Sequence, residues 1–191
     1  MNESLIKSLA NCIRNWEKKM WKESQPRVVI IDSQAVKNTD NAREKWRCHY
    51  KCTNGIKRHL LVDVLWIPIC ILVTTANIND RIWWKEMVKK NKDVLKWIET
   101  MLADRWYSWK WFKISIKKTT SITVTISEKP SRKKWEWFKP EHKRWIVERS
   151  NARMEKCRRL HKNNERYVEN SATMCKICFI RLVVRRLTKL N

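Results

Sequence analysis

The stretch RVVIID, residues 27–32, is a short apolar run that ends in an acid, which is typical of a buried strand. A second run of the same kind is ETMLAD, residues 99–104. Ligands of α/β proteins commonly gather where strands end, so Asp32 and Asp104 converge if the two strands are neighbours. The pairing of these two runs therefore decides both the fold and the site.

The rest of the chain alternates between strand-like and helix-like runs. RHLLVDVL (58–65) and PICILVTTA (68–76) predict a hairpin, and SITVTIS (121–127) predicts a further strand. Apolar residues recur at helical spacing in 3–20, 79–98, 144–160 and 171–190. Residues 33–57 are polar and irregular, with a turn expected at Asn54-Gly55, and 128–143 form a basic loop. The order predicts a mixed α/β layer arrangement around one core.

The charge balance points to a polyanionic partner. The 191 residues include 43 Lys and Arg against 19 Asp and Glu, a net charge of +24, yet 43% are hydrophobic, so the chain is not a disordered basic tail. Nucleic acid is the first expectation and an anionic membrane surface the second. Apolar runs stay well short of the roughly 20 residues of a membrane span. The N-terminus has no signal-peptide pattern, so we expect a cytoplasmic location.

Seven cysteines are expected to be thiols in a reducing compartment. The spacings Cys48-x3-Cys52 and Cys175-x2-Cys178 allow a zinc site. The second pair falls on a run with helical apolar spacing, where cysteine behaves as a small hydrophobic residue, and we favour that interpretation.

Three acids could form a cation site. Asp32 and Asp104 end strand runs, and Glu148 lies on a helical run between Arg144 and Arg149. Carboxylates suit hard divalent cations, and two such ions about 4 Å apart can clamp the attacking and leaving oxygens of a phosphodiester. The alternative is structural: aspartate commonly starts a turn after a strand, and a glutamate among arginines is usually a solvated ion pair.

Four segments carry a resemblance to a known family: VVIIDSQAVKNT, NGIKRHLLVDVLWIPICILVTTANINDR, LADRWYSWKWF, and the run from KRWIVERSNARMEKCRRL to CFIRLVVRRL. Together they resemble the bacterial insertion-sequence transposases of the IS-five type, over about residues 18–188. These are DDE enzymes with an RNase H-like catalytic core. The resemblance implies an α/β fold, an RNase H-like mixed sheet flanked by helices. It also implies an N-terminal helix in 1–25, as a remnant of, or a linker from, a missing DNA-recognition segment, and a DDE catalytic core in 26–190.

The resemblance implies that Asp32, Asp104 and Glu148 are the catalytic and metal-binding triad, which holds two Mg²⁺ or Mn²⁺ ions. Arg144 matches the Arg-x3-Glu part of the signature around the last acid. Two positions depart from the pattern: Glu155 stands where Lys is expected, with Lys156 after it, and Glu141 stands in a Tyr position.

Five cations are candidates for DNA binding: Arg144, Lys57, Arg58, Arg149 and Lys156. For Lys57, Arg58 and the adjacent His59, a solvated basic strand edge is the alternative to phosphate contact. Asp63 is expected to be a strand residue near the site, and Asp80 a helix start.

The implied function is metal-dependent cleavage and strand transfer of insertion-sequence DNA, by a homodimer on double-stranded DNA. The alternative is a catalytically inactive, truncated remnant that binds DNA non-specifically, with a steep dependence on salt. No membrane partner is expected.

The chain has one glycine and 13 tryptophans, the reverse of ordinary usage. Family glycine positions hold tryptophan here at Trp21, Trp46, Trp66, Trp106 and Trp109, and at one or both of Trp135 and Trp137. Trp66 falls at the tip of the expected hairpin, and Trp106 and Trp109 fall in a strand-to-helix turn, two places that favour a positive φ. Some bacteria read UGA as glycine, and we hypothesise that these tryptophans are such glycines translated by the standard code. The alternative is genuine tryptophan that stacks on DNA bases or packs in the core.

Overall fold

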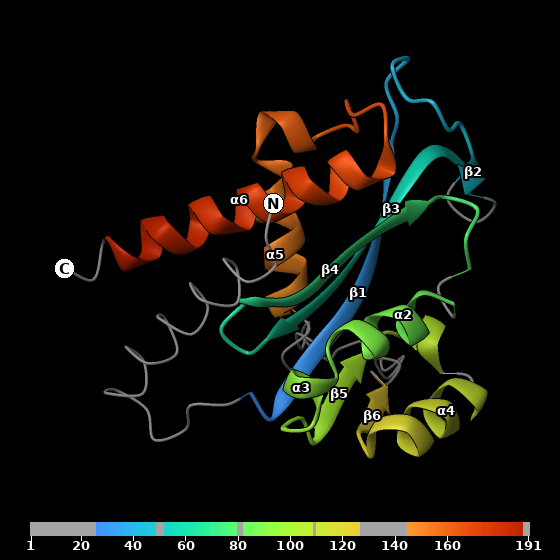
Figure 1. Cartoon of the computed structure of the whole chain (residues 1–191), viewed down its shortest axis with the longest axis vertical. Coiled ribbons are helices and arrows are strands. Elements are labelled where there is room, and N and C mark those ends of the chain that lie inside the picture. Colours follow the sequence, from blue (N-terminus) through green and yellow to red (C-terminus); the bar gives the residue numbers. More distant parts are fainter. Residues whose placement is uncertain (1–25, 49–51, 80–81, 109, 127–144, 189–191) are drawn as a thin grey trace, which may run out of the picture.

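The computed structural model of the protein describes residues 26–48, 52–79, 82–108, 110–126 and 145–188. The expected N-terminal helix in 1–25 and basic loop in 128–143 lie outside these residues, as do Asp80, Glu141 and Arg144. Figure 1 shows a central sheet with helices on both of its faces.

The sheet has the order β2-β3-β1-β5-β6, with β4 also paired to β3. Its strands are β1 (Val28–Lys37), β2 (Arg47–Cys48), β3 (Thr53–Asp63), β4 (Pro68–Thr75), β5 (Thr100–Ala103) and β6 (Thr123–Ile126). β1, β3 and β4 are antiparallel neighbours, whereas β5 pairs parallel to both β1 and β6. The predicted hairpin and the two predicted later strands are confirmed.

The helices lie on opposite faces of this sheet. They are α2 (Trp83–Lys90), α3 (Lys92–Leu95), α4 (Lys110–Thr120), α5 (Trp145–Glu155) and α6 (Val168–Leu187), with short 3-10 helices η1 (Arg105–Tyr107) and η2 (Arg158–Leu160). Alternation along β1 explains the layers. Val29 and Ile31 join a buried cluster with residues of α2 and α4, while Ile30 joins a second cluster with residues of α5 and α6.

Cys175 and Cys178 are buried in the second cluster, on α6. Burial raises the pKa of both thiols, to about 12 for Cys178. Their predicted behaviour as small hydrophobic residues is therefore confirmed.

The expectation of irregular structure in 33–57 is wrong for 33–37 and 53–57, which are strand, whereas 39–46 are irregular as expected. β1 continues to Lys37, because its polar second half pairs with the first half of β3, from Ser33 opposite His59 to Lys37 opposite Gly55. Gly55 is accordingly a strand residue and not a turn residue. A Cβ at this position would lie 1.8 Å from the Val36 carbonyl oxygen, so close backbone approach requires glycine here.

Trp66 lies in the turn between β3 and β4 with a φ of 61°, in the left-handed region that favours glycine. The backbone expected for this position is therefore confirmed. Trp106 lies in the 3-10 helix η1 without a positive φ, so the expectation for the second turn is wrong at this residue. Trp46 is exposed, and Trp21, Trp109, Trp135 and Trp137 lie outside the described residues.

No helix in the described part of the chain combines the length and the apolar character that a membrane crossing needs.

Candidate active site

Asp32 and Asp104 end up side by side because their strands are parallel neighbours. Ile30 of β1 pairs with Leu102 of β5, and this register, continued for two residues, places Asp32 beside Asp104. Ile30 and Leu102 both contact the cluster under α5 and α6. Since side chains alternate between faces, Asp32 faces the same helices. The two acids thus share one face of the sheet, at the edge where β5 ends beside the middle of β1.

Asp104 follows the last residue of β5 and starts η1. Its carboxylate accepts a hydrogen bond from the Arg105 backbone N–H, as a helix-starting aspartate does. The side chain is half-buried. The structural role that we considered for this acid is therefore present.

Helix α5 carries the third acid across this edge. Asn151, on the second turn of α5, donates a hydrogen bond from Nδ2 to Oδ2 of Asp32 over 2.7 Å. Asn151 is 8% exposed, so this bond is made in a largely dry environment. Glu148 lies three residues earlier and therefore on the same side of the helix. Its side chain is exposed.

A second side-chain contact joins the same two elements. Gln34 of β1 donates from Nε2 to Oε1 of Glu155, the last residue of α5. Gln34 lies two residues after Asp32 and so on the same face of the strand. Glu148, Asn151 and Glu155 form one stripe that follows β1. Sequence analysis missed Asn151 and Gln34 as site residues; their spacing from Glu148 and Asp32 was the available signal.

The carboxylate oxygens of Asp32, Asp104 and Glu148 suit a hard divalent cation, but the three side chains do not lie close enough together to form a metal site. Asp32, Asp104 and Glu148 offer only oxygen ligands, which Mg²⁺ and Mn²⁺ prefer. Among the described residues, however, no group of three His, Cys, Asp or Glu side chains lies close enough together to hold a metal ion. One oxygen of Asp32 is instead bonded to Asn151. Cation binding at this edge therefore requires the carboxylates to move closer together.

Asp63 is the last residue of β3, three positions beyond Leu60, the residue that lies opposite Asp32. It pairs with Val29, is 2% exposed, and accepts hydrogen bonds from the backbone N–H groups of Leu65 and Ile67, each over 2.9 Å. Asp63 is thus a strand residue, as expected, and its carboxylate holds the turn that contains Trp66.

Lys57, Arg58 and His59 are not at a solvated strand edge, because β3 lies between β1 and β4. Lys57 donates from Nζ to the Ile78 carbonyl, and Arg58 donates from Nη1 to the Leu160 carbonyl, each over 2.8 Å. Burial lowers the pKa of Arg58. Lys57 is 8% exposed and Arg58 is 1% exposed, so both are too buried to contact DNA phosphates, and their candidacy for DNA binding is wrong.

His59 is buried and neutral. Its Nε2 lies 2.8 Å from Thr74 Oγ1, and its ring stacks on Trp83 at 4.5 Å between centroids. Burial, with a smaller contribution from Lys57, lowers the pKa of His59 to about 3. This histidine therefore has no charge to offer a phosphate near neutral pH.

The remaining candidate cations are on the surface. Arg149 is exposed beside Glu148, with its guanidinium 5.2 Å from the centroid of the Trp145 ring. Lys156 is exposed just after α5. Both positions permit a phosphate contact on the side of the sheet that carries Asp32.

Comparison with solved structures supports an RNase H-like arrangement. A chain of the simian T-cell lymphotropic virus intasome, solved in complex with the PP2A regulatory subunit B56 gamma, is similar to this one with a TM-score of 0.52 and 14% identity, over 80% of this chain and 48% of that one. The catalytic core domain of BIV integrase gives 0.46 and 10%, over 80% and 82%, and the catalytic domain of Mos1 mariner transposase gives 0.42 and 10%, over 97% and 91%. At 14% identity, the similarity to the intasome chain shows a shared fold and nothing more.

The protein thus has the mixed sheet and flanking helices of the RNase H-like class. Residues 23–183 match the family described as "Transposase DDE domain", and the chain belongs to this family. It spans about half the length of the intasome chain. A search among curated proteins found no match.

Proposed function

We propose that the protein is a DDE transposase of the IS-five type, which cleaves and joins DNA with the help of divalent cations. The observations that support this proposal are the parallel pairing of β1 with β5, the strands of Asp32 and Asp104, and the hydrogen bond from Asn151 of α5, the helix of Glu148, to Asp32. Membership of the transposase family supports the same activity. The net charge of +24 suits a DNA substrate, and we expect a homodimer on DNA in the cytoplasm.

Asp32 and Asp104 would hold the first cation, and Glu148 would complete the ligands of a second. Bound Mg²⁺ or Mn²⁺ supplies a lowered pKa for the attacking water and charge neutralisation at the phosphate. In the first step water attacks a phosphorus at the element's end, the P–O3′ bond breaks, and the DNA keeps a free 3′ hydroxyl. In the second step that hydroxyl attacks a target phosphodiester, and a target 3′ hydroxyl leaves. The carboxylates must be ionised to act as ligands, so activity falls at acid pH.

The proposal is tested with purified protein and labelled duplexes taken from the DNA that flanks the gene. With Mn²⁺ or Mg²⁺ we expect nicked and joined products from the parent protein, and neither product from Asp104→Asn. The matched control is Asp93→Asn, which removes an exposed carboxylate from α3. Equal cleavage by the parent and Asp104→Asn overturns the assignment of the triad.

A second candidate function is DNA binding without catalysis. It is favoured by the distance between the three acids, which do not form a metal-holding group in this structure. In that case the protein shifts labelled DNA at low salt, but no product forms at any concentration of Mn²⁺.

A further inference from the structure

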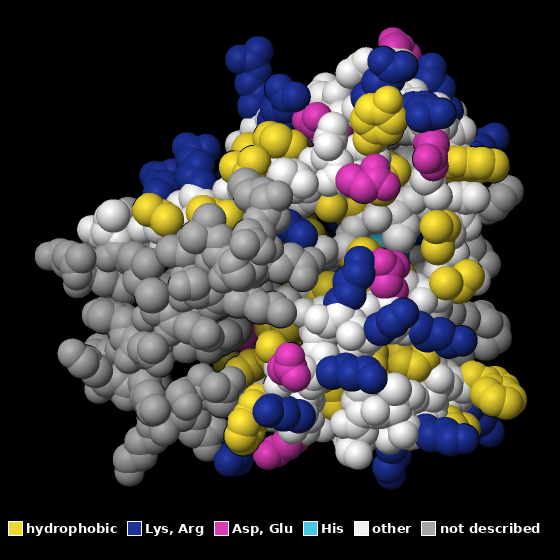
Figure 2. Space-filling view, viewed as in Figure 1, with side chains coloured by type: hydrophobic (Ala, Val, Ile, Leu, Met, Phe, Trp, Pro, Cys, Tyr) yellow, Lys and Arg dark blue, Asp and Glu magenta, His cyan; other side chains and the backbone are white. Residues whose placement is uncertain are grey.

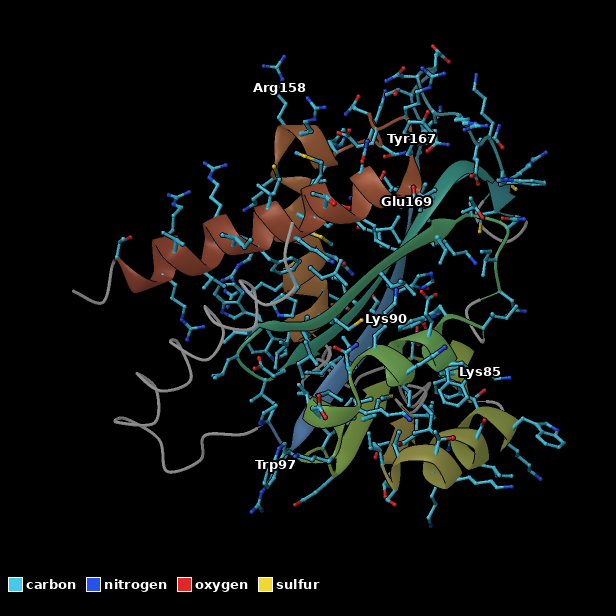
Figure 3. The ribbon with its side chains drawn as sticks, viewed as in Figure 1. Lys85, Lys90, Trp97, Arg158, Tyr167 and Glu169 are labelled. Carbon is cyan, nitrogen blue, oxygen red and sulfur yellow. The ribbon has the colours of Figure 1, made fainter. Side chains whose placement is uncertain are left out.

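One end of the molecule carries a surface rich in cations, of which only Lys156 is also a candidate for DNA binding at the active site. Between α5 and α6, the side chains of Arg158, Arg159, His161 and Lys162 are exposed, and with Asn164 they line one surface depression. This set of lining residues contains no Asp or Glu. Arg158 projects from this end of the molecule, away from the sheet (Figure 3).

This segment is tied to the end of β1 by a buried asparagine. Asn163 is 4% exposed; its backbone N–H donates to the Lys37 carbonyl over 2.9 Å, and its side-chain Nδ2 donates to Oδ1 of Asn38 over 2.8 Å. Its own Oδ1 accepts a bond of 2.6 Å from the Ser171 hydroxyl of α6. The cations around Asn163 therefore stand on a fixed frame, which lowers the entropy that a ligand must remove on binding.

The cations at the rim are also held in place. Arg159 pairs with Glu165 over 2.9 Å, and the exposed Tyr167 has the guanidinium groups of both Arg43 and Arg166 at 5.8 Å from its ring centroid. A backbone hydrogen bond from Arg43 to Arg166 joins the two segments. We call residues 37–47 and 156–166 together the basic end.

The basic end is strongly positive. Residues 156–166 contain five Lys or Arg and one Glu, and residues 37–47 contain four Lys or Arg, one Asp and one Glu, so the net charges are +4 and +2. Dark blue Lys and Arg side chains protrude from this end in Figure 2, with a few carboxylates among them. Net charge of this density on a fixed frame favours a polyanion with closely spaced charges.

We propose that the basic end binds the phosphate backbone of duplex DNA, as a second contact with the same DNA that the candidate active site cleaves. The partner's identity rests on the proposed function. Lys37 follows Asp32 by five residues on β1, which at about 3.3 Å per residue is roughly 17 Å. Roughly five base pairs of duplex cover that distance at about 3.4 Å each. A duplex that runs along β1 from the cut site therefore reaches the basic end.

The test is the binding of a labelled duplex of about 30 base pairs by the full chain, measured by fluorescence anisotropy from about 50 to about 300 mM KCl. All proteins carry Asp32→Asn, so that the DNA stays uncut. The variant is Arg158→Gln with Arg159→Gln and Lys162→Gln. The matched control is Lys113→Gln with Lys117→Gln and Lys118→Gln, which removes the same charge from exposed positions of α4. A double variant, Arg158→Gln with Lys162→Gln, keeps the Arg159–Glu165 pair in case the triple variant folds poorly.

We expect the triple variant to lose about two to three units from the slope of log affinity against log salt, and the double variant about one to two, with the control close to the parent. Equal losses in variant and control overturn the inference, as does a parent protein that does not bind DNA. Binding of phosphatidylserine vesicles in place of DNA through these residues also overturns it. This binding test does not measure cleavage, so its outcome is independent of the cleavage assay. If the cleavage assay fails but the triple variant alone loses DNA binding, the proposed nuclease activity is rejected while DNA binding by the basic end is supported.

Discussion

Asn151 donates a 2.7 Å hydrogen bond to Asp32, and this contact joins the helix that carries Glu148 to the strand that carries the first acid. A donor at this place has two effects. It stabilises the half-buried carboxylate of Asp32, and it fixes how α5 sits over the edge where β5 ends beside β1.

Asn151→Ala removes this donor. We expect the free energy of unfolding to fall by about 1–3 kcal/mol, because Asp32 loses a largely buried hydrogen bond to its charged group. We also expect Mn²⁺ affinity to fall by about tenfold, as happens when a partner that orients a ligand is lost. Urea unfolding and calorimetry measure the two effects. Asn170→Ala, at an exposed position of α6, should change neither; similar losses in both variants would show that Asn151 has no special place.

Trp66 provides a test of the glycine hypothesis at the level of the backbone. Its ring is half-buried, with the guanidinium of Arg153 at 3.8 Å and that of Arg186 at 5.2 Å, so both Trp66→Gly and Trp66→Ala lose the same ring contacts. The φ of 61° strains alanine and not glycine. We expect Trp66→Gly to be more stable than Trp66→Ala by about 1 kcal/mol in urea unfolding. Alanine equal to glycine would contradict this.

The codon for residue 66 and the mass of the protein from its natural host decide the matter independently. A UGA codon with a glycine mass supports reassignment, whereas a UGG codon excludes it at this position.

Gly55 and Ser121 should respond to substitution in opposite directions. Gly55→Ala places a Cβ against the Val36 carbonyl in the middle of the sheet, and we expect a loss of about 3 kcal/mol or more. Ser121 follows α4 with a φ of 61°, so Ser121→Gly should stabilise the protein by about 0.5–1 kcal/mol. Denaturant midpoints check both values, and a tolerated Gly55→Ala would contradict the close approach of β1 and β3.

His59 should make the protein less stable in mild acid. Its pKa is about 3 in the folded state and near 6.5 when unfolded, so below pH 6.5 the unfolded chain binds the extra proton. Stability therefore falls as the pH drops, by up to about 1.4 kcal/mol per pH unit from this group. Urea unfolding between about pH 7 and pH 5 measures the slope. His59→Gln should flatten it, while His161→Gln, at an exposed position, should not. An unchanged slope in His59→Gln would remove His59 as the cause.

Strand positions could be predicted from the sequence where a short apolar run is bounded by polar segments. β4, β5 and β6 are short runs of β-branched and apolar residues, and their positions were predictable from this pattern. The second half of β1, SQAVK, is half-exposed and polar, so pairing with β3 and not composition makes it a strand. Gly55 was expected in a turn for the same reason: it is a strand residue because it pairs with Lys37, which is distant in sequence.

The site residues that directly follow an apolar run could be predicted from the sequence. Asp32 and Asp104 follow apolar runs, whereas Asn151 becomes relevant through a contact across 119 residues. The burial of Lys57 and Arg58 was not predictable, because their partners are the carbonyl groups of Ile78 and Leu160 from other elements. A basic strand looks the same in sequence whether its charges meet water, phosphate or backbone oxygens.

The central claim is that carboxylates from β1, from the end of β5 and from α5 together bind a divalent cation. Calorimetric titration of the purified protein with Mn²⁺ tests it most directly. We expect binding by the parent and by Asp93→Asn, and a loss of about tenfold or more in affinity for each of Asp32→Asn, Asp104→Asn and Glu148→Gln, since a direct ligand matters at least as much as its supporting partner. A parent protein that binds no Mn²⁺, or three variants that bind it as the parent does, would contradict the claim.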